Sequence, residues 1–301
     1  DLRRILDNET DLHVSKIKDV MTTTGVTCGP KILAAEALNI MEKVSGQEEA
    51  VKELVATGLL LGSRGVVEGI DYVKTLGDMT DEAEVKRIGA EVIARGGAAV
   101  DCPVSGGCHR ADTGNISIFA GCERATFERI LPLLTIMGRR VLHTGDLGSA
   151  SVLKVLTNFL ATANLVSVAE ALTVAKGAGM DLGVAYEAMA ISSGTSFVHE
   201  TEGQVILNGS RDISFTMDLV AKDIGLFQEV ADRANVPLEL NPLLISIFQD
   251  GIARFGPREL SPNIIKRLEE ATGLDVTAPG FPAEMTDEEP EERGAEVIVK
   301  R

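Results

Sequence analysis

The spacing of hydrophobic and polar positions changes once along the chain. Before about residue 145, short apolar runs bounded by glycine alternate with stretches of helical periodicity. Residues 82–94 have helical spacing behind Asp81, a good N-cap, while 97–104, 116–121 and 139–145 read as strands. Strands that alternate with helices predict a βαβ arrangement and a parallel sheet.

A different pattern follows. Ser149–Lys176 contains no glycine and no proline, and it is apolar around much of its circumference. It predicts a helix of roughly 40 Å that is buried between domains or subunits. Asn241 is expected to cap a later helix, with Pro242 in its first position. The helical stretches expected after the long one are 184–192, 215–234, 242–255 and 263–272.

The length of 301 residues predicts two domains and a tail. We expect an α/β domain over residues 1–147, a helical domain over 148–278, and an acidic tail over 279–301. TDEEPEE in this tail carries five acids in seven residues and should be solvated. The EVIV that follows is a candidate edge strand or partner contact.

Charge and composition exclude several classes of function. Lys plus Arg number 29 and Asp plus Glu 45, so the formal net charge is 29 − 45 = −16, which argues against nucleic-acid binding. No uninterrupted apolar run reaches the ~18–20 residues of a membrane span, so we expect no membrane association. The four cysteines have no CxxC spacing and the four histidines no metal-ligand spacing, which predicts reduced thiols, a cytoplasmic protein and no metal.

The first stretch that could carry chemistry is Asp101–Gly107, which follows a predicted strand. The backbone N–H groups of Gly106 and Gly107, with the Ser105 hydroxyl, can hold a carboxylate. The alternative is a tight turn in which glycine supplies a positive φ.

Two further stretches carry lysines. Lys154 and Asn158 are four residues apart and share one face of the long helix. An ammonium in apolar surroundings can donate a proton to a developing alkoxide, and the alternative is a lysine that reaches the surface. Lys222 can reach a cofactor or a carboxylate, and the alternative is a solvated charge with an ion-pair partner.

These three stretches, in this order, resemble the β-hydroxyacid dehydrogenase family of the 6-phosphogluconate dehydrogenase superfamily, which includes 3-hydroxyisobutyrate dehydrogenase and tartronate semialdehyde reductase. DCPVSGG is similar to the family's DAPVSGG loop, Gly145–Asn158 to its catalytic-lysine segment, and Lys222–Leu226 to its KDLGL segment. The resemblance runs from about Gly69 to Phe255. It implies a Rossmann-type N-terminal domain, a long interdomain helix and an all-α C-terminal domain.

The resemblance also implies NAD(P)-dependent transfer of hydride between nicotinamide and a small β-hydroxyacid or its semialdehyde. Lys154 would be the general acid/base and Asn158 its helper. Ser105, Gly106 and Gly107 would bind the substrate carboxylate. Lys222 would lie close to cofactor and substrate.

The N-terminal part departs from the family. The sequence contains no GxGxxG, and it resembles the family only from the middle of the first helix, so the first strand and Gly-rich loop are missing. Either the given sequence starts inside the domain or the protein lacks these elements. The segment 75–79 is altered too. These departures motivate the alternative function, a non-catalytic or cofactor-deficient paralogue that keeps the substrate-domain scaffold.

The remaining expectations concern cofactor and partners. No acid follows the second strand to accept a ribose hydroxyl, so Lys16 favours a 2′-phosphate and NADP over NAD, unless it is a solvated surface lysine. Val44 and Ser45 are the other expected cofactor contacts. The long apolar helix predicts a homodimer or homotetramer. A weaker hypothesis is an interaction protein that uses the acidic tail.

Overall fold

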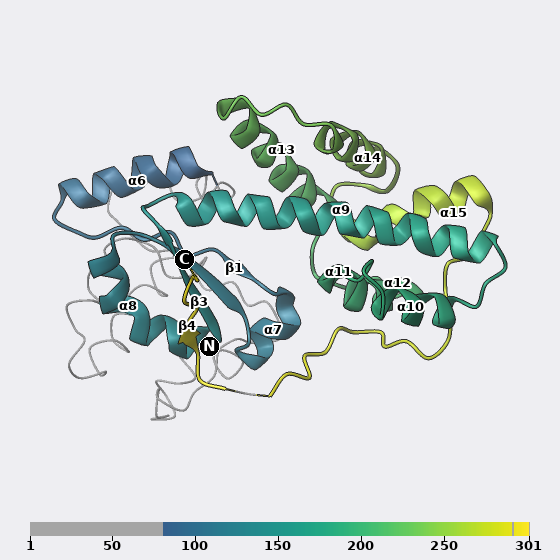
Figure 1. Cartoon of the computed structure of the whole chain (residues 1–301). Coiled ribbons are helices and arrows are strands. Elements are labelled where there is room, and N and C mark those ends of the chain that lie inside the picture. Colours follow the sequence, from purple (N-terminus) through teal and green to yellow (C-terminus); the bar gives the residue numbers. More distant parts are fainter. Residues whose placement is uncertain (1–80, 291, 301) are drawn as a thin grey trace. The chain divides into compact units, whose positions relative to one another are not determined.

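The computed structural model describes residues 81–290 and 292–300 (Figure 1). They divide into two compact units, whose limits fall between Lys154 and Val155 and between Thr286 and Asp287. Of the described residues, the first unit comprises 81–154 together with 287–290 and 292–300, and the second comprises Val155–Thr286. The domain limits expected from the sequence, 1–147, 148–278 and 279–301, stay predictions.

The described part of the first unit contains a four-stranded sheet in the order β1-β2-β3-β4. β1 is antiparallel to β2, whereas β2, β3 and β4 are parallel, so the expectation of a purely parallel sheet is wrong. Glycines with positive φ turn the chain at the end of β1, and the next strand therefore returns beside it. The elements are α6 (Glu82–Ala94), β1 (Val104–Ser105), α7 (Gly107–Thr113), β2 (Ser117–Gly121), α8 (Arg124–Met137), β3 (Arg140–Gly145) and β4 (Ala295–Glu296).

The core of this unit lies between the sheet and α8. Ile118 and Ala120 alternate with more exposed positions along β2, as expected for a half-buried strand, and both are fully buried. Phe127 and Leu134 of α8 pack in the same cluster as Val141 of β3. The predicted helix 82–94 is confirmed, and Asp81 caps it by accepting a hydrogen bond from the backbone N–H of Ala83.

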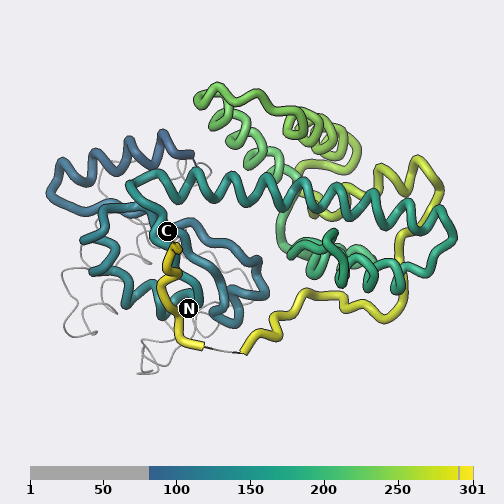
Figure 2. The backbone as a smooth tube through the Cα atoms, in the orientation of Figure 1, coloured from purple at the N-terminus to yellow at the C-terminus, as the bar shows by residue number. Residues whose placement is uncertain are grey.

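Helix α9 spans Ser149–Gly177 without a break, as the sequence predicts (Figure 2). By length and composition alone it could cross a membrane, with a mean hydropathy of 1.5, although polar residues interrupt its apolar sequence. The expected absence of membrane association stays a prediction. Only 28% of that apolar window is buried, and Leu160 and Val174 are exposed. Burial of this helix between domains or subunits stays a prediction.

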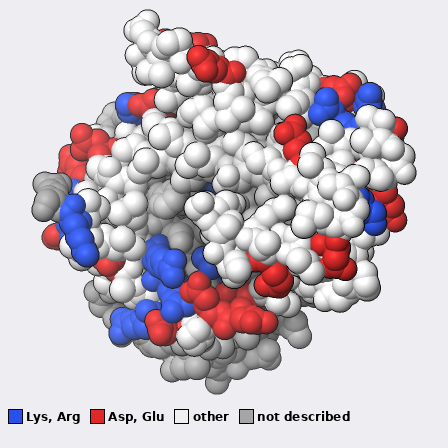
Figure 3. Space-filling view, turned by 45° about the vertical axis from the view of Figure 1, so that its right-hand side comes forward, with Lys and Arg blue, Asp and Glu red and all other residues white. Residues whose placement is uncertain are grey.

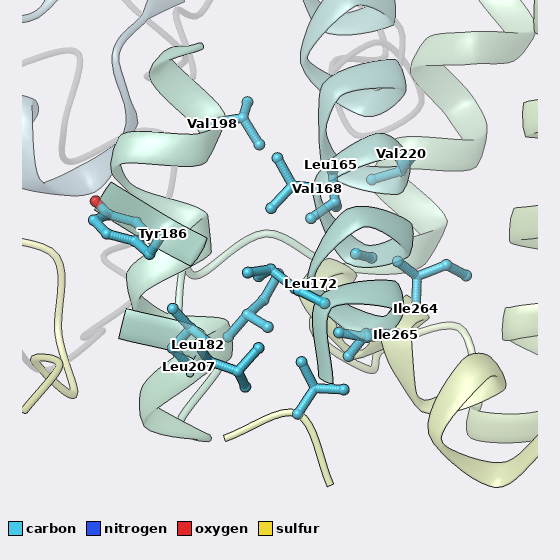
Figure 4. Close-up of a cluster of buried hydrophobic side chains, with 14 of the residues drawn as sticks. Leu165, Val168, Leu172, Leu182, Tyr186, Val198, Leu207, Val220, Ile264 and Ile265 are labelled. Atoms are coloured by element: carbon cyan, nitrogen blue, oxygen red, sulfur yellow. The ribbon is translucent and has the colours of Figure 1, made fainter. Parts of the chain in front are cut away.

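The second unit is helical. Its core joins Leu165, Val168 and Leu172 of α9 to apolar side chains of the helices that follow (Figure 4). Leu182 and Tyr186 face this row. The helices after α9 are α10 (Leu182–Ala190), α11 (Phe197–Glu200), α12 (Glu202–Asn208), α13 (Met217–Arg233), α14 (Leu240–Phe255), the 3₁₀ helix η1 (Ser261–Ile265) and α15 (Lys266–Thr272).

One expected helix start is wrong. α14 begins at Leu240 with Glu239 as its N-cap, so Asn241 lies inside the first turn. Asn241 is fully buried, and its amide donates to the carbonyl oxygen of Ile224 and to Oε1 of Gln228. The side chain bonds to α13 instead of capping its own helix, because a buried amide needs partners.

The C-terminal segment belongs to the first unit. β4 pairs with β3, and the N–H of Val297 donates to the carbonyl oxygen of Val141 at 2.8 Å, so the expected edge strand is confirmed (Figure 2). The acids before it were expected to be solvated. That expectation is wrong for Asp287 and Glu289, which are half-buried and bonded to first-unit side chains. Basic and acidic side chains adjoin on the face shown in Figure 3.

Candidate functional site

The turn Ser105–Gly107 joins β1 to α7. Gly106 has φ 135° and Gly107 has φ 79°, which are backbone conformations that residues other than glycine rarely adopt. A Cβ on Gly106 would lie 3.1 Å from Cδ of Arg110, and one on Gly107 would lie 3.0 Å from the His109 ring. The tight-turn interpretation is therefore confirmed. The role of these residues in carboxylate binding stays a prediction.

Asp101, at the start of this motif, anchors helix α9. It is 1% exposed. Its Oδ1 accepts from the N–H of Gly148 at 3.0 Å, and its Oδ2 accepts from the N–H and hydroxyl of Ser151 at 2.8 and 3.1 Å. The carboxylate thus satisfies donors that a helix N-terminus leaves open, and its charge is favourable there. Burial raises the pKa of Asp101, and these hydrogen bonds oppose the rise.

The contact between Asp101 and the start of α9 was not predicted, although the sequence indicates that Asp101 needs partners. An acid inside the apolar run AAVDCPV needs partners once it is buried. Asp101 also pairs with Gly121 through two backbone hydrogen bonds of 2.9 and 3.0 Å. A Cβ on Gly121 would lie 2.1 Å from the Asp101 carboxylate, so glycine is required for this close approach.

Lys154 lies in the second turn of α9 and is half-buried. Asn158 follows one turn later on the same helix and is also half-buried. Asp101 therefore fixes the start of the helix that carries both residues. Their catalytic roles stay predictions.

Asn158 and Lys222 meet at one buried carboxylate, that of Asp223. Nδ2 of Asn158 donates to Oδ2 of Asp223, and Nζ of Lys222 lies 3.0 Å from Oδ1. The Asp223 side chain is 4% exposed, so it needs both partners. The pair Phe159 and Phe227, with ring centroids 4.1 Å apart, holds α9 against α13 beside this network.

Asp223 is the residue that sequence reasoning missed here. The sequence drew attention to Lys222-Asp223 but assigned a role only to the lysine. The buried acid fixes the amide orientation of Asn158, because a carboxylate can only accept and must therefore face the NH₂ group. The network turns the carbonyl oxygen of this amide away from Asp223.

One expected cofactor contact lies within the described residues. The Lys222 side chain is 34% exposed, and its ammonium carries three donors, which fits hydrogen bonding to an oxygen of a dinucleotide. Lys16, Val44 and Ser45 lie outside the described residues.

Within the described ranges, no group of three His, Cys, Asp or Glu side chains is suited to a metal ion.

An α/β unit followed by a helical unit is consistent with a Rossmann-like N-terminal domain and an all-α C-terminal domain, the class that the comparisons show. Two family models match these parts. The model for the NAD binding domain of 6-phosphogluconate dehydrogenase matches residues 11–145. The model for the NAD-binding domain of NADP-dependent 3-hydroxyisobutyrate dehydrogenase matches residues 148–268, which include α9. The chain belongs to the β-hydroxyacid dehydrogenase family.

Individual proteins with dehydrogenase in their names also match this chain. The chain is 36% identical to 2-(hydroxymethyl)glutarate dehydrogenase of Eubacterium barkeri over 59% of this chain and 60% of that protein. It is 29% identical to NAD-dependent L-serine dehydrogenase of Pseudomonas aeruginosa over 79% of this chain and 84% of that protein. A crystal structure of 3-hydroxyisobutyrate dehydrogenase from Salmonella typhimurium matches with a TM-score of 0.57 and 28% identity, over 62% of this chain and 66% of that one. The first and third of these matches thus span less than two thirds of the relatives' own length.

Proposed function

We propose that this protein is an NAD(P)-dependent oxidoreductase that transfers hydride between nicotinamide and a small β-hydroxyacid or its semialdehyde. The observation that carries the proposal is the Asn158–Asp223–Lys222 network, which lies one helical turn beyond Lys154 on α9. It supplies an oriented amide from α9 and an ammonium from α13, and Lys154 adds a second ammonium one turn earlier on α9. The names of the family's dehydrogenases and reductases support the same chemistry.

Lys154 acts as the general acid/base in this proposal. In the oxidation direction its amine takes the proton from the substrate hydroxyl, and in the reduction direction its ammonium donates a proton to the developing alkoxide. Asn158 positions the substrate oxygen through the part of its amide that Asp223 leaves available. A bound nicotinamide dinucleotide supplies the carbon that takes or gives the hydride.

The turn Ser105–Gly107 binds the substrate carboxylate in this proposal. Its backbone N–H groups and the Ser105 hydroxyl are donors that match an anion. The proposed substrate is therefore a small carboxylate, and its hydroxyl or carbonyl group is on the β-carbon, one carbon beyond the neighbour of the carboxylate.

We also propose NADP as the preferred cofactor, in line with the name of the model that matches the helical half. The named NAD-dependent relative makes the opposite preference the outcome to test. Lys222 would donate to the cofactor. The thiols of Cys102 and Cys122 are free and buried, which supports a cytoplasmic enzyme, and the exposed apolar side chains of α9 support a homodimer or homotetramer.

Turnover of C3–C5 hydroxyacids and semialdehydes with NADPH and NADH tests the proposal. We expect Lys154→Ala to lower kcat about 10²–10⁴-fold while the thermal transition stays within a few degrees. Lys154→Arg keeps the charge but gives up its proton far less readily, so it should be nearly as inactive. Lys176→Ala, in the last turn of the same helix, is the control. Near-normal turnover by Lys154→Ala would refute the assignment.

A full-length gene product that binds neither NADPH nor NADH would favour the other function, a cofactor-deficient paralogue that keeps the scaffold. Titration of both dinucleotides, followed by their fluorescence, separates the two functions. Binding of either one rejects the paralogue.

A further inference from the structure

The C-terminal segment presents two half-buried carboxylates to helix α7. Oδ2 of Asp287 accepts from the hydroxyl of Thr113 and, at 2.7 Å, from Nδ2 of Asn115. Oε1 of Glu289 accepts from Nη2 of Arg110 at 2.7 Å. Arg110 lies in the middle of α7 and Thr113 is its last residue. The segment therefore holds this seven-residue helix at two points.

Glu289 also ties α7 to the start of β3. Its Oε2 lies 2.5 Å from Nη1 of Arg139 and 3.5 Å from Nη2 of Arg140, the first residue of β3. The side chains of Arg110 and Arg139 are only 18% and 15% exposed. Charge-assisted hydrogen bonds shielded from water are stronger and more directional than exposed ion pairs. The two arginines therefore meet across one carboxylate with little freedom.

Arg110 leads from this carboxylate to the turn before α7. A Cβ on Gly106 would lie 3.1 Å from Cδ and 3.3 Å from Cβ of Arg110, so the arginine side chain covers the Gly106 backbone. Gly106 has the positive φ that only glycine adopts readily. Glycine itself offers little resistance to a change of this angle, so the packed arginine is what limits the backbone.

Asp287 is built to be ionised in this position. Burial would raise the pKa of Asp287, but the hydrogen bonds from Thr113 and Asn115, with smaller help from the N–H of Glu289 and the charge of Arg110, outweigh it and lower the pKa. Asn115, which is 2% exposed, also donates to the backbone carbonyl of Glu289 at 3.1 Å. Asn115 thus binds both the Asp287 side chain and the Glu289 backbone of the C-terminal segment.

We propose that Asp287 and Glu289 are positioning residues for the turn Ser105–Gly107: Asp287 holds the end of α7, and Glu289 holds Arg110 over Gly106. The inference rests on the proposed function, because it assigns this turn to the substrate carboxylate. Neither acid touches the substrate. They keep the backbone N–H groups of the turn in the conformation that accepts it.

Steady-state kinetics with the full chain provides the first test. We expect Asp287→Asn and Glu289→Gln each to raise KM for the hydroxyacid about tenfold, with kcat within about twofold. This corresponds to a fall in the binding-competent population of the turn to about one tenth. Lys154 would be untouched, so the chemical step stays the same.

Two controls come from the same segment. Glu288 is exposed and lies between the two acids, so Glu288→Gln should change nothing. Glu296 pairs with Arg124 of α8 at 2.5 Å and not with α7. Glu296→Gln should lower the thermal transition as much as Glu289→Gln does, but leave KM unchanged. A rise in KM with Glu296→Gln equal to that with Glu289→Gln would overturn the proposal, because general docking of the segment would then explain the effect.

Hydrogen exchange supplies a readout that does not depend on activity. In Glu289→Gln and Asp287→Asn, the peptide covering residues 103–113 should exchange faster than in Glu288→Gln, while the peptide covering 82–94 in α6, for which no contact with either acid is seen, should not. If wild-type protein turns over no hydroxyacid, the proposed function fails, and exchange of 103–113 still decides whether the segment positions the turn. Unchanged exchange there would overturn the inference, whatever the kinetics show.

Discussion

Removal of the Asp101 carboxylate tests whether a buried acid holds the helix that carries Lys154. In Asp101→Ala, the backbone N–H groups of Gly148 and Ser151 and the Ser151 hydroxyl lose their acceptor. Gly148 is buried and Ser151 is fully buried, so water cannot replace the carboxylate easily. Each buried donor that is left without a partner costs about 1–3 kcal/mol. The donors share one site, so their costs do not simply add. We therefore expect a loss of about 3–5 kcal/mol in the free energy of unfolding.

The expected fall in the thermal transition follows from this loss. At about 2–4 °C per kcal/mol for chains of this order of size, the transition of Asp101→Ala should fall by about 10 °C. Asp101→Asn keeps one oxygen acceptor but turns an NH₂ group toward another donor, so its fall should be about half as large. The assay is thermal unfolding followed by fluorescence of a dye, with far-ultraviolet circular dichroism to confirm the fold at 20 °C.

Asp146→Ala is the matched control, because Asp146 is exposed and lies three residues before α9. It should change the transition by less than 2 °C. An Asp101→Ala transition within 2 °C of wild type would refute the reasoning. It would mean that the start of α9 does not depend on this carboxylate.

Two further predictions concern the second unit. Asn158→Ala and Asp223→Asn should each lower kcat about 10–100-fold. The double variant should lose no more activity than the less active single variant, because both substitutions remove one oriented amide. Additive losses in steady-state assays would contradict this. Burial raises the pKa of Glu202 to about 8, and its Oε2 is buried without a hydrogen bond from any described residue. A raised pKa means that the protonated acid stabilises the fold fully below about pH 4.5 and that this contribution is lost as the pH rises through 8. Glu202→Gln does not titrate, so its thermal transition should match wild type near pH 5 and exceed it by several degrees at pH 8.5. The exposed Glu187→Gln is the control, and a pH-independent difference would count against the reasoning.

Most of the described helices could be predicted because their signals are local. The cap at Asp81 and the glycine-free run of α9 depend on neighbours in the sequence. Asn241 shows where such reasoning fails. Its type and the following proline favoured a cap, but the tertiary partner Gln228 decided its position.

The candidate site was predictable to the extent that motifs mark it. Lys154, Asn158 and Lys222 came from recognisable segments, whereas the roles of Asp101 and Asp223 depend on contacts with residues 47 and 65 positions away. No spacing rule relates such distant positions. The docking of the acidic tail was missed for the same reason. Its charges alone predicted exposure to solvent, and no pattern in the sequence indicates that Arg110 and Arg139 face Glu289.

The pairing of β4 with β3 has a consequence for how the chain is made. More than a hundred residues, including the whole helical unit, leave the ribosome between these two strands. Until residues 295–297 emerge, the N–H and C=O groups on this edge of β3 are open to any other extended peptide. A nascent or C-terminally truncated molecule therefore exposes a strand edge that residues 295–297 cover at Arg140 and Val141 in the folded chain.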